Sequence, residues 1–297
     1  MNKNILMGKN ICKQYGKQEV LKNLDITIKS GCIYGLIGRN GVGKTTLLGI
    51  LTGQNKANSG EITLDGEQVW ENKKALSQIC FSRELQKATQ AFQTGYKVNA
   101  YLKMAEMYYP NWDKEYAKKL VAHFKLDEKK HIYKISKGQS SMVSIIVALA
   151  SRSPITILDE PTAGLDIVAR DNFYKLLLKD FEENQRTFIL STHIIDEASS
   201  IFERVLILDD GKIIEDKDTL ELVGEFRTLA TSEDISAIIG NNQVEILNEK
   251  TFGKHKIYTL RASEDVFARL EENGAELEEI SLQNTFLALC GNDEEVL

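Results

Sequence analysis

The amino-acid sequence predicts an α/β protein with a mostly parallel sheet at its centre. Three observations lead to this fold class. A glycine-rich loop at residues 38–46 lies between an apolar strand pattern and a helix pattern. Apolar strand patterns alternate with helix patterns from residue 155 to residue 208, which is typical of parallel sheets covered on both faces. A block of helix patterns separates these two regions. We therefore expect an antiparallel β subdomain, an inserted α-helical subdomain and a small C-terminal α+β region around the core.

The N-terminal residues 4–30 alternate between apolar and polar side chains, as half-buried strands do. Tyr15 and Gly16 interrupt this alternation and predict a turn between two strands. A further short strand is expected at residues 59–66, which end in a tight turn. Together these segments predict the antiparallel β subdomain.

The glycine-rich loop has the sequence GRNGVGKTT and follows the buried-strand pattern Cys32–Ile37. A strand before such a loop and a helix after it form the context in which this pattern binds phosphate. The glycines let several backbone N–H groups point inward, and the helix N-terminus adds partial positive charge. Lys44 then places an ammonium against the outer phosphates, and the Thr45 hydroxyl is available to a magnesium ion. The sequence therefore predicts a nucleotide-binding protein.

The composition narrows the class of protein further. The chain has 297 residues, enough for one large domain or two smaller ones, and its net charge is −6. A negative net charge disfavours a general nucleic-acid-binding protein, because such proteins usually carry a basic face. The four cysteines lack metal-ligand spacing, so we expect reduced thiols. No signal-peptide core precedes the first strand, and the longest apolar helix pattern, residues 142–150, is too short to cross a bilayer.

The block of helix patterns is expected to form a subdomain at about residues 85–152. Its predicted helices occupy residues 98–104, 113–124 and 140–150. Ser136 and Gly138 precede the last of them and leave backbone donors exposed at its N-terminus. Such a helix start can bind an anion, although a serine before a helix is most often only an N-cap.

A pair of acids follows the apolar strand pattern at residues 155–158. Asp159 and Glu160 would emerge at the C-terminal edge of the sheet, where ligands bind in open α/β folds. Asp159 is expected to reach a magnesium ion, and Glu160 to polarise an attacking water. A helix pattern at residues 167–181 and a strand pattern at residues 187–190 come next in the chain.

The chain changes character after about residue 220. Short strand and helix patterns follow one another there, at residues 244–247, 257–260, 265–272 and 282–290. We therefore expect two domains, residues 1–220 and residues 221–297, with no catalytic group in the second. That region is either a regulatory or dimerising module or a passive extension packed on the sheet.

These motifs together resemble the ATP-binding subunit of ABC transporters, a P-loop NTPase-type protein. The elements that carry the resemblance follow one another in the family's order and spacing: Tyr15, Gly38–Thr46, Ile135–Gln139, Ile155–Glu160, Ala163–Asp166 and His193. They extend over roughly residues 4–220. The resemblance implies an ATPase that uses ATP and Mg²⁺.

The resemblance also implies a role for each matching residue. Glu160 would be the catalytic base, and His193 would be the switch histidine that contacts the γ-phosphate. Thr45 and Asp159 would serve the magnesium ion. The residues implied in ATP binding, from adenine stacking to the phosphates, are Tyr15, Asn40, Gly41, Gly43, Lys44, Thr45, Thr46, Ser136, Gly138 and Gln139. Asp166 would belong to the loop that crosses the interface between two subunits.

Two positions depart from the family pattern. The signature motif, which in this family binds ATP held by a second subunit, usually has two adjacent glycines, and here Lys137 replaces the first of them. An added cation near a γ-phosphate is electrostatically tolerable, and members that serve ABC-2-type exporters resemble this variant. The family also places a glutamine, as a magnesium ligand, after the strand at residues 79–81. Glu84 aligns with it, with Gln86 as a competitor, and a carboxylate is an acceptable hard oxygen ligand.

The implied function is that of an ATPase subunit that powers export through separate transmembrane permease subunits. Two cassettes, identical or different, would dimerise around ATP at the cytoplasmic face of the cell membrane, and no nucleic acid would be involved. An importer subunit is the second interpretation, and a non-transport ABC protein acting on ribosomes or DNA is the third. Ribosome-acting members carry two cassettes in one chain and DNA-repair members insert long coiled coils, and this sequence has neither feature. The substrate would be chosen by the membrane subunit.

Overall fold

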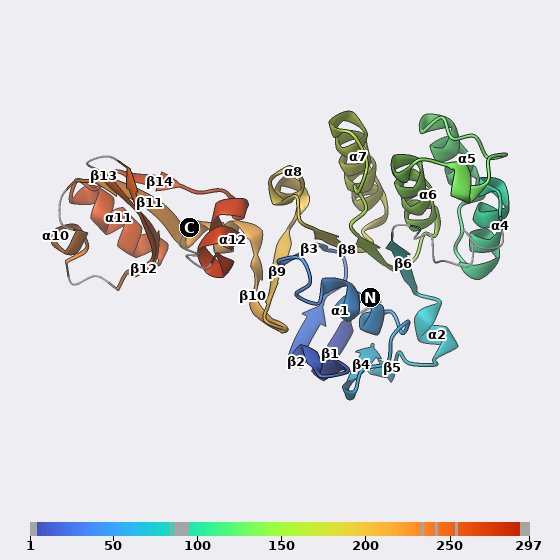
Figure 1. Ribbon diagram of the computed structural model, residues 1–297, viewed down its shortest axis with the longest axis horizontal. Helices are drawn as coiled ribbons and strands as arrows, with labels where there is room; N and C mark the ends of the chain where they lie inside the picture. The colour runs from blue at the N-terminus through green and yellow to red at the C-terminus, as the bar shows by residue number, and fades with distance from the viewer. Residues whose placement is uncertain are drawn as a thin grey trace.

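The computed structural model describes residues 5–83, 85, 95–232, 235–240, 243–252 and 255–291. A larger part is built on a six-stranded sheet, and a smaller C-terminal part on a four-stranded sheet lies to one side of it (Figure 1). Among these residues, no helix combines the length and the apolar character that crossing a membrane requires.

The antiparallel β subdomain is formed by four strands in the order β2-β1-β4-β5. Their bounds are β1 (Leu6–Tyr15), β2 (Gln18–Ile28), β4 (Ser59–Leu64) and β5 (Glu67–Gln68). β1 pairs with both β2 and β4, and the turn expected near Tyr15 joins β1 to β2. Helix α2 (Lys73–Leu76), capped by the Asn72 side chain, leads from this subdomain into the main sheet.

The main sheet has the strand order β10-β9-β3-β8-β7-β6, and all of its pairings except β9–β10 are parallel. The strands are β3 (Ile33–Ile37), β6 (Ile79–Arg83), β7 (Ile155–Asp159), β8 (Thr187–Thr192), β9 (Arg204–Asp209) and β10 (Lys212–Asp218). The helices that follow β3, β7 and β8 are α1 (Lys44–Leu51), α7 (Ile167–Asn184) and α8 (Ile195–Ala198), the last continued by the 3₁₀ turn η2 (Ser199–Ile201).

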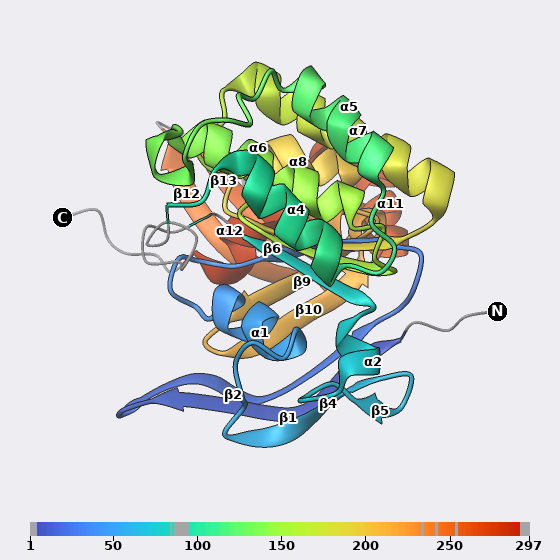
Figure 2. The same cartoon turned by 90° about the vertical axis from the view of Figure 1, so that its right-hand side faces the viewer.

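Both faces of this sheet are covered, because neighbouring residues of one strand enter different cores. Ile157 packs with α1 and the antiparallel subdomain, whereas Leu158 packs with the helices on the opposite face. In β8, Ile189 likewise packs on the side of α1, and Leu190 packs on the opposite face. The predicted doubly covered parallel sheet is therefore confirmed (Figure 2).

The inserted helical block contains α4 (Val98–Tyr108), α5 (Lys114–His123), the 3₁₀ turn η1 (Ile132–Lys134) and α6 (Lys137–Ala150). Helix α6 begins three residues before the predicted start, because Ser136 and Gln139 form a capping box at its first turn. Ser82 at the end of β6 donates a hydrogen bond to the Ser144 carbonyl over 2.7 Å, and the Ser144 hydroxyl donates to the Arg83 carbonyl over 2.9 Å. These bonds fix α6 against the sheet.

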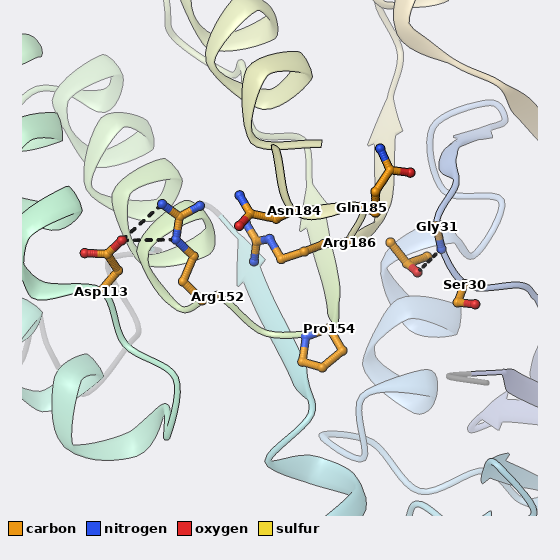
Figure 3. A pocket seen from close by; sticks show the side chains of 9 residues that line it. Ser30, Gly31, Asp113, Arg152, Pro154, Asn184, Gln185 and Arg186 are labelled. Carbon is orange, nitrogen blue, oxygen red and sulfur yellow. Dashed lines mark hydrogen bonds and ion pairs between the residues drawn. The ribbon is translucent and has the colours of Figure 1, made fainter. Parts of the chain in front are cut away.

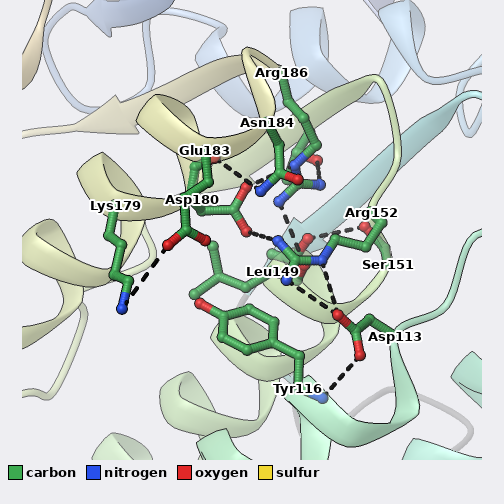
Figure 4. A network of polar contacts seen from close by, with 12 residues as sticks. Asp113, Tyr116, Leu149, Ser151, Arg152, Lys179, Asp180, Glu183, Asn184 and Arg186 are labelled. Carbon is green, nitrogen blue, oxygen red and sulfur yellow. Dashed lines mark hydrogen bonds and ion pairs between the residues drawn. The ribbon is translucent and has the colours of Figure 1, made fainter.

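A chain of alternating charges ties the helical block to α7 and β8 (Figure 4). Arg152 contacts Asp113, the N-cap of α5, over 3.1 Å, and it also contacts Asp180 of α7. Arg186 donates from Nε to the other oxygen of Asp180 over 2.8 Å. An open pocket of about 670 Å³ lies over this network at the N-terminal edge of β7 and β8, lined by both arginines (Figure 3).

The C-terminal part follows helix α9 (Thr219–Gly224) and contains strands in the order β12-β13-β11-β14. Its elements are β11 (Phe226–Thr231), α10 (Ile235–Ile239), β12 (Glu245–Phe252), β13 (His255–Arg261), α11 (Glu264–Glu272), β14 (Leu277–Glu279) and α12 (Leu282–Cys290). Its sheet and α11 enclose a separate small core. The last helix does not join that core. Leu282 and Cys290 of α12 pack instead into the main core with Ile195 and Ala198 of α8.

Candidate functional site

The glycine-rich loop connects β3 to α1, as the sequence predicted. Gly41 and Gly43 adopt φ angles of 81° and 114°, which side chains with a Cβ rarely adopt. At Gly38 a Cβ would lie 2.5 Å from the Leu208 carbonyl oxygen of β9. Only glycine therefore permits this path of the backbone, and the path ends with the N-terminus of α1 facing the loop interior.

Lys44 occupies the interior of the loop. Its ammonium donates hydrogen bonds to the Gly38 carbonyl over 2.6 Å and to the Arg39 carbonyl over 3.2 Å. Burial lowers the pKa of Lys44, while the nearby Glu160 and Asp159 carboxylates act in the opposite direction. A buried cation beside a helix N-terminus is a strong site for an anion such as phosphate.

Thr45 and Asp159 bring the loop and the end of β7 together. The Thr45 hydroxyl donates to Asp159 Oδ2 over 2.7 Å, and the Asp159 side chain is buried. A hydroxyl and a carboxylate are hard oxygen ligands, the kind that Mg²⁺ prefers. No set of three or more His, Cys, Asp or Glu side chains within the described ranges is arranged to hold a metal ion. This donor set fits a magnesium ion that takes its other ligands from phosphate and water.

Glu160 and His193 form the second half of this cluster. His193 Nδ1 lies 2.7 Å from Glu160 Oε2, and about half of the histidine side chain is exposed. Glu160 adopts a φ of 51°, in the left-handed region that residues other than glycine seldom occupy. The backbone thus turns sharply after Asp159, so that the two consecutive carboxylates have different neighbours. One contacts Thr45 and the other contacts His193.

Ser191 was not singled out in the sequence, and the structure places it between the two acids. β8 extends two residues beyond the predicted strand, so Ser191 pairs with Asp159 in the parallel register. Its hydroxyl donates to Asp159 Oδ1 and accepts from the Glu160 backbone N–H. The sequence does contain a signal for Ser191, because it is a hydroxyl residue near the end of β8, the strand that pairs with β7.

The residues predicted as the signature motif form the N-cap and first turn of α6. Ser136 and Gln139 hydrogen-bond to each other in the capping box, and Gly138 packs against the loop that follows Glu160. A Cβ at Gly138 would lie 2.6 Å from the Gly164 carbonyl oxygen, which explains the need for glycine there. In the described chain, the side-chain hydrogen bonds of Ser136 and Gln139 stay within the box and do not join them to the glycine-rich loop.

Tyr15 lies at the end of β1 with about half of its surface exposed, and the Lys13 ammonium stands 4.9 Å from its ring centroid. A pocket of about 470 Å³ lies next to the glycine-rich loop. It is lined by residues 18–20 of β2, 39–42 of the loop, 209–211 of the β9–β10 turn, and Cys290. Tyr15 does not line this pocket, although it lies three residues before Gln18, which does. The sequence did not predict Cys290 as a lining residue. Burial raises the pKa of the Cys290 thiol to about 12, so the thiol stays protonated.

The remaining predicted residues are distributed as follows. Asn40 is exposed on the loop, and Thr46 lies in the first turn of α1. Asp166 is the N-cap of α7 and accepts a hydrogen bond from the Ala169 N–H over 2.8 Å. Glu84 and its competitor Gln86 lie outside the described residues.

Comparison with known proteins places the chain among ATP-binding proteins. A family model described as ABC transporter matches residues 21–163. The ABC transporter ATP-binding protein YtrB of Bacillus subtilis (strain 168) is 27% identical over 243 residues, which cover 81% of this chain and 82% of YtrB. The bacitracin transport ATP-binding protein BcrA of Bacillus licheniformis is 32% identical over 215 residues, covering 71% of this chain and 69% of BcrA.

Importer proteins are similar to the same extent. The spermidine/putrescine import ATP-binding protein PotA of Spiroplasma citri is 34% identical over 251 residues, covering 81% of this chain and 70% of PotA.

Solved structures share the fold. One is the ATP-binding subunit of an ABC transporter, with a TM-score of 0.62 at 23% identity, covering 73% of this chain and 91% of that chain. Another is a dimeric ATP-binding cassette in a post-hydrolysis state with ADP and Pi. It has a TM-score of 0.62 at 24% identity and covers 72% of this chain and 98% of that one. These similarities confirm the predicted fold class.

Proposed function

The chain belongs to the ABC transporter family of ATP-binding proteins, and from this premise we propose that it is the ATPase subunit of an exporter. As a member of this family it is an ATPase that works with transmembrane subunits. The observation that carries the assignment of its site is the convergence of Lys44, the Thr45–Asp159 pair and the Glu160–His193 pair. All five groups lie where β3, β7 and β8 end, the edge at which open α/β sheets bind ligands.

Each group has a defined task in phosphoryl transfer. Lys44 turns from the loop carbonyls toward the β- and γ-phosphates and balances their charge, and the loop N–H groups orient them. Thr45 and Asp159 would hold Mg²⁺, which would supply positive charge against the phosphate oxygens. Glu160 accepts a proton from the attacking water. His193 contacts Glu160 over 2.7 Å. In this role it fixes the orientation of the base and would contact the γ-phosphate of bound ATP.

The site is completed by a second subunit. In this proposal the N-terminus of α6, with Ser136 and Gly138, binds the γ-phosphate of ATP held by the other cassette. The capping box engages the N–H groups of Ser136 and Gln139 and so fixes the first turn of α6 before ATP arrives. The dimeric cassette with the same fold supports this arrangement. Hydrolysis then removes the group that joins the two faces.

Two directions of transport are compatible with the family, and we propose export. The similarity to the bacitracin transport protein BcrA supports it, as does the Ser-Lys-Gly-Gln signature at residues 136–139. Import is the second candidate, because PotA, an import protein, is 34% identical. In either case we propose that the chain lies on the cytoplasmic face of the membrane, bound to permease subunits. We further propose residues 1–220 as the ATP-binding domain, with its helical subdomain at about 85–152, and residues 221–297 as an accessory domain.

The Glu160→Gln variant tests the catalytic assignment. It should bind ATP, lose about 100-fold or more of the hydrolysis rate, and accumulate as an ATP-bound dimer detected by light scattering. Glu183→Gln is a matched control, because Glu183 is an exposed residue of α7, 3.9 Å from Lys179. Near-normal turnover in Glu160→Gln would remove Glu160 as the base.

The direction of transport is tested with the cognate permease reconstituted in liposomes, with ATP supplied only outside. Bacitracin and spermidine are the probes, since relatives of both kinds carry those names. ATP-dependent accumulation of bacitracin in the lumen supports export. Release of preloaded spermidine, without any accumulation of bacitracin, would contradict export and favour import.

A further inference from the structure

Ser191 is the one residue of β8 that contacts both acids of the site. Its hydroxyl donates to Asp159 Oδ1 over 2.5 Å, and the Glu160 backbone N–H donates to the same hydroxyl over 3.0 Å. The side chain is fully buried, so water does not compete for these bonds. A serine hydroxyl has one proton, and here it is committed to Asp159, while a lone pair serves Glu160.

The consequence for Asp159 is that both of its oxygens are held. Oδ1 accepts from Ser191, and Oδ2 accepts from the Thr45 hydroxyl over 2.7 Å. A carboxylate held at both ends has one orientation. Oδ2 is therefore the oxygen presented, together with the Thr45 hydroxyl, to a cation that enters the loop.

The consequence for Glu160 concerns its backbone. Its left-handed φ of 51° directs the chain sharply away from β7, and its N–H is held by the Ser191 hydroxyl and by the Ser191 carbonyl over 3.2 Å. Two acceptors from one residue secure a conformation that glutamate does not adopt by preference. Two residues further along the chain, directly after β8, His193 contacts the carboxylate of the same glutamate. The end of β8 thus orients both acids.

We propose that Ser191 is a positioning residue for magnesium, which sets the orientation of Asp159 without itself touching the metal. This inference rests on the proposed function, because it takes Asp159 as a magnesium ligand. Partners in the second layer around metal ligands typically account for about 10- to 100-fold in metal affinity. Loss of the hydroxyl should therefore weaken magnesium binding by a factor in that range, and should leave metal-free nucleotide binding unchanged.

The test compares Ser191→Ala with the wild type by titrating Mg²⁺ against binding of a fluorescent ATP analogue. The Mg²⁺ concentration for half-maximal enhancement should rise about 10- to 100-fold, with unchanged binding in excess EDTA. Ser151→Ala is the matched control, since Ser151 is also fully buried and its hydroxyl donates to the Ala148 carbonyl over 2.8 Å, at the opposite edge of the sheet. It should leave the Mg²⁺ dependence unchanged.

Ser191→Thr provides a second readout, because it keeps the hydroxyl. Its Mg²⁺ half-saturation should lie closer to that of the wild type than to that of Ser191→Ala. An unchanged Mg²⁺ dependence in Ser191→Ala, or an equal loss in Ser191→Thr, would overturn the inference. If Mg²⁺ fails to enhance nucleotide binding in the wild type, the proposed role of Asp159 fails instead. Those two failures are thus distinguishable.

Discussion

Replacing Asp180 by asparagine should destabilise the protein while leaving its phosphate loop intact. The Asp180 side chain has no exposed surface, and it lies between two guanidinium groups, those of Arg152 and Arg186. Breaking a buried ion pair typically costs about 3–5 kcal/mol, because the remaining charge stays buried without its partner. Arg152 keeps Asp113, and Arg186 keeps the Ser153 and Leu149 carbonyls, so we expect the lower end, about 3 kcal/mol.

That loss corresponds to a fall in melting temperature of about 6 °C for a chain of this size. Asp113→Asn is the control with the same chemical change. Asp113 is about one-third exposed and contacts Arg152 alone among the arginines of the network, so its loss should cost about 1 kcal/mol or less. Asparagine also preserves the N-cap of α5. Urea denaturation of both variants measures the difference. If Asp180→Asn loses no more stability than Asp113→Asn, the buried network does not stabilise the fold as argued.

Three further predictions concern the site and the C-terminal part. Lys44→Ala should weaken ATP binding about 100-fold by calorimetry, and unchanged affinity would contradict the phosphate loop. His193→Ala should lower kcat about 10- to 100-fold with little change in ATP affinity, because histidine orients the base, and an affinity loss without a kcat loss would refute this. Burial raises the pKa of Glu225, but hydrogen bonds from Lys217 and Arg261 together lower that pKa by more than burial raises it, so the net shift is downward. Its contribution to stability should be present above its ordinary pKa and lost as pH falls through the lowered value, a slope that Glu225→Gln should flatten in acid denaturation.

The elements that depend on local pattern were predictable from the sequence. A glycine loop between an apolar strand and a helix needs only neighbouring residues, and the structure contains it between β3 and α1. The two acids after β7 were predictable for the same reason, since a buried strand delivers the next residues to the edge of the sheet. The proximity of Thr45 to Asp159, 114 positions apart, then followed from parallel topology.

Contacts between distant segments were not predictable in this way. The sequence indicated a helix at residues 282–290 but not the surface that it covers. In the structure, Leu282 and Cys290 of α12 join Ile195 and Ala198 of α8 in the main core. The four-stranded C-terminal sheet, which lies between α8 and α12 in the sequence, has a core of its own. Truncation after Leu220 would therefore uncover apolar side chains of α8, the helix that follows His193. A shortened chain that tests the role of the accessory domain must therefore keep α12.

The packing of α6 joins, within one chain, two segments that we propose to act in neighbouring ATP sites. The Ser141 hydroxyl donates to the Ala163 carbonyl over 2.6 Å, and the Ala163 N–H donates to the Glu160 carbonyl over 3.2 Å. Gly138 approaches Gly164 so closely that a Cβ at this position would collide with the Gly164 carbonyl oxygen. Hydrogen bonds thus run from α6 through Ala163 to the backbone of Glu160, the residue that we propose as the base. In the proposed dimer, the helix start assigned to the partner's ATP therefore packs against the same loop that carries the base for the chain's own ATP.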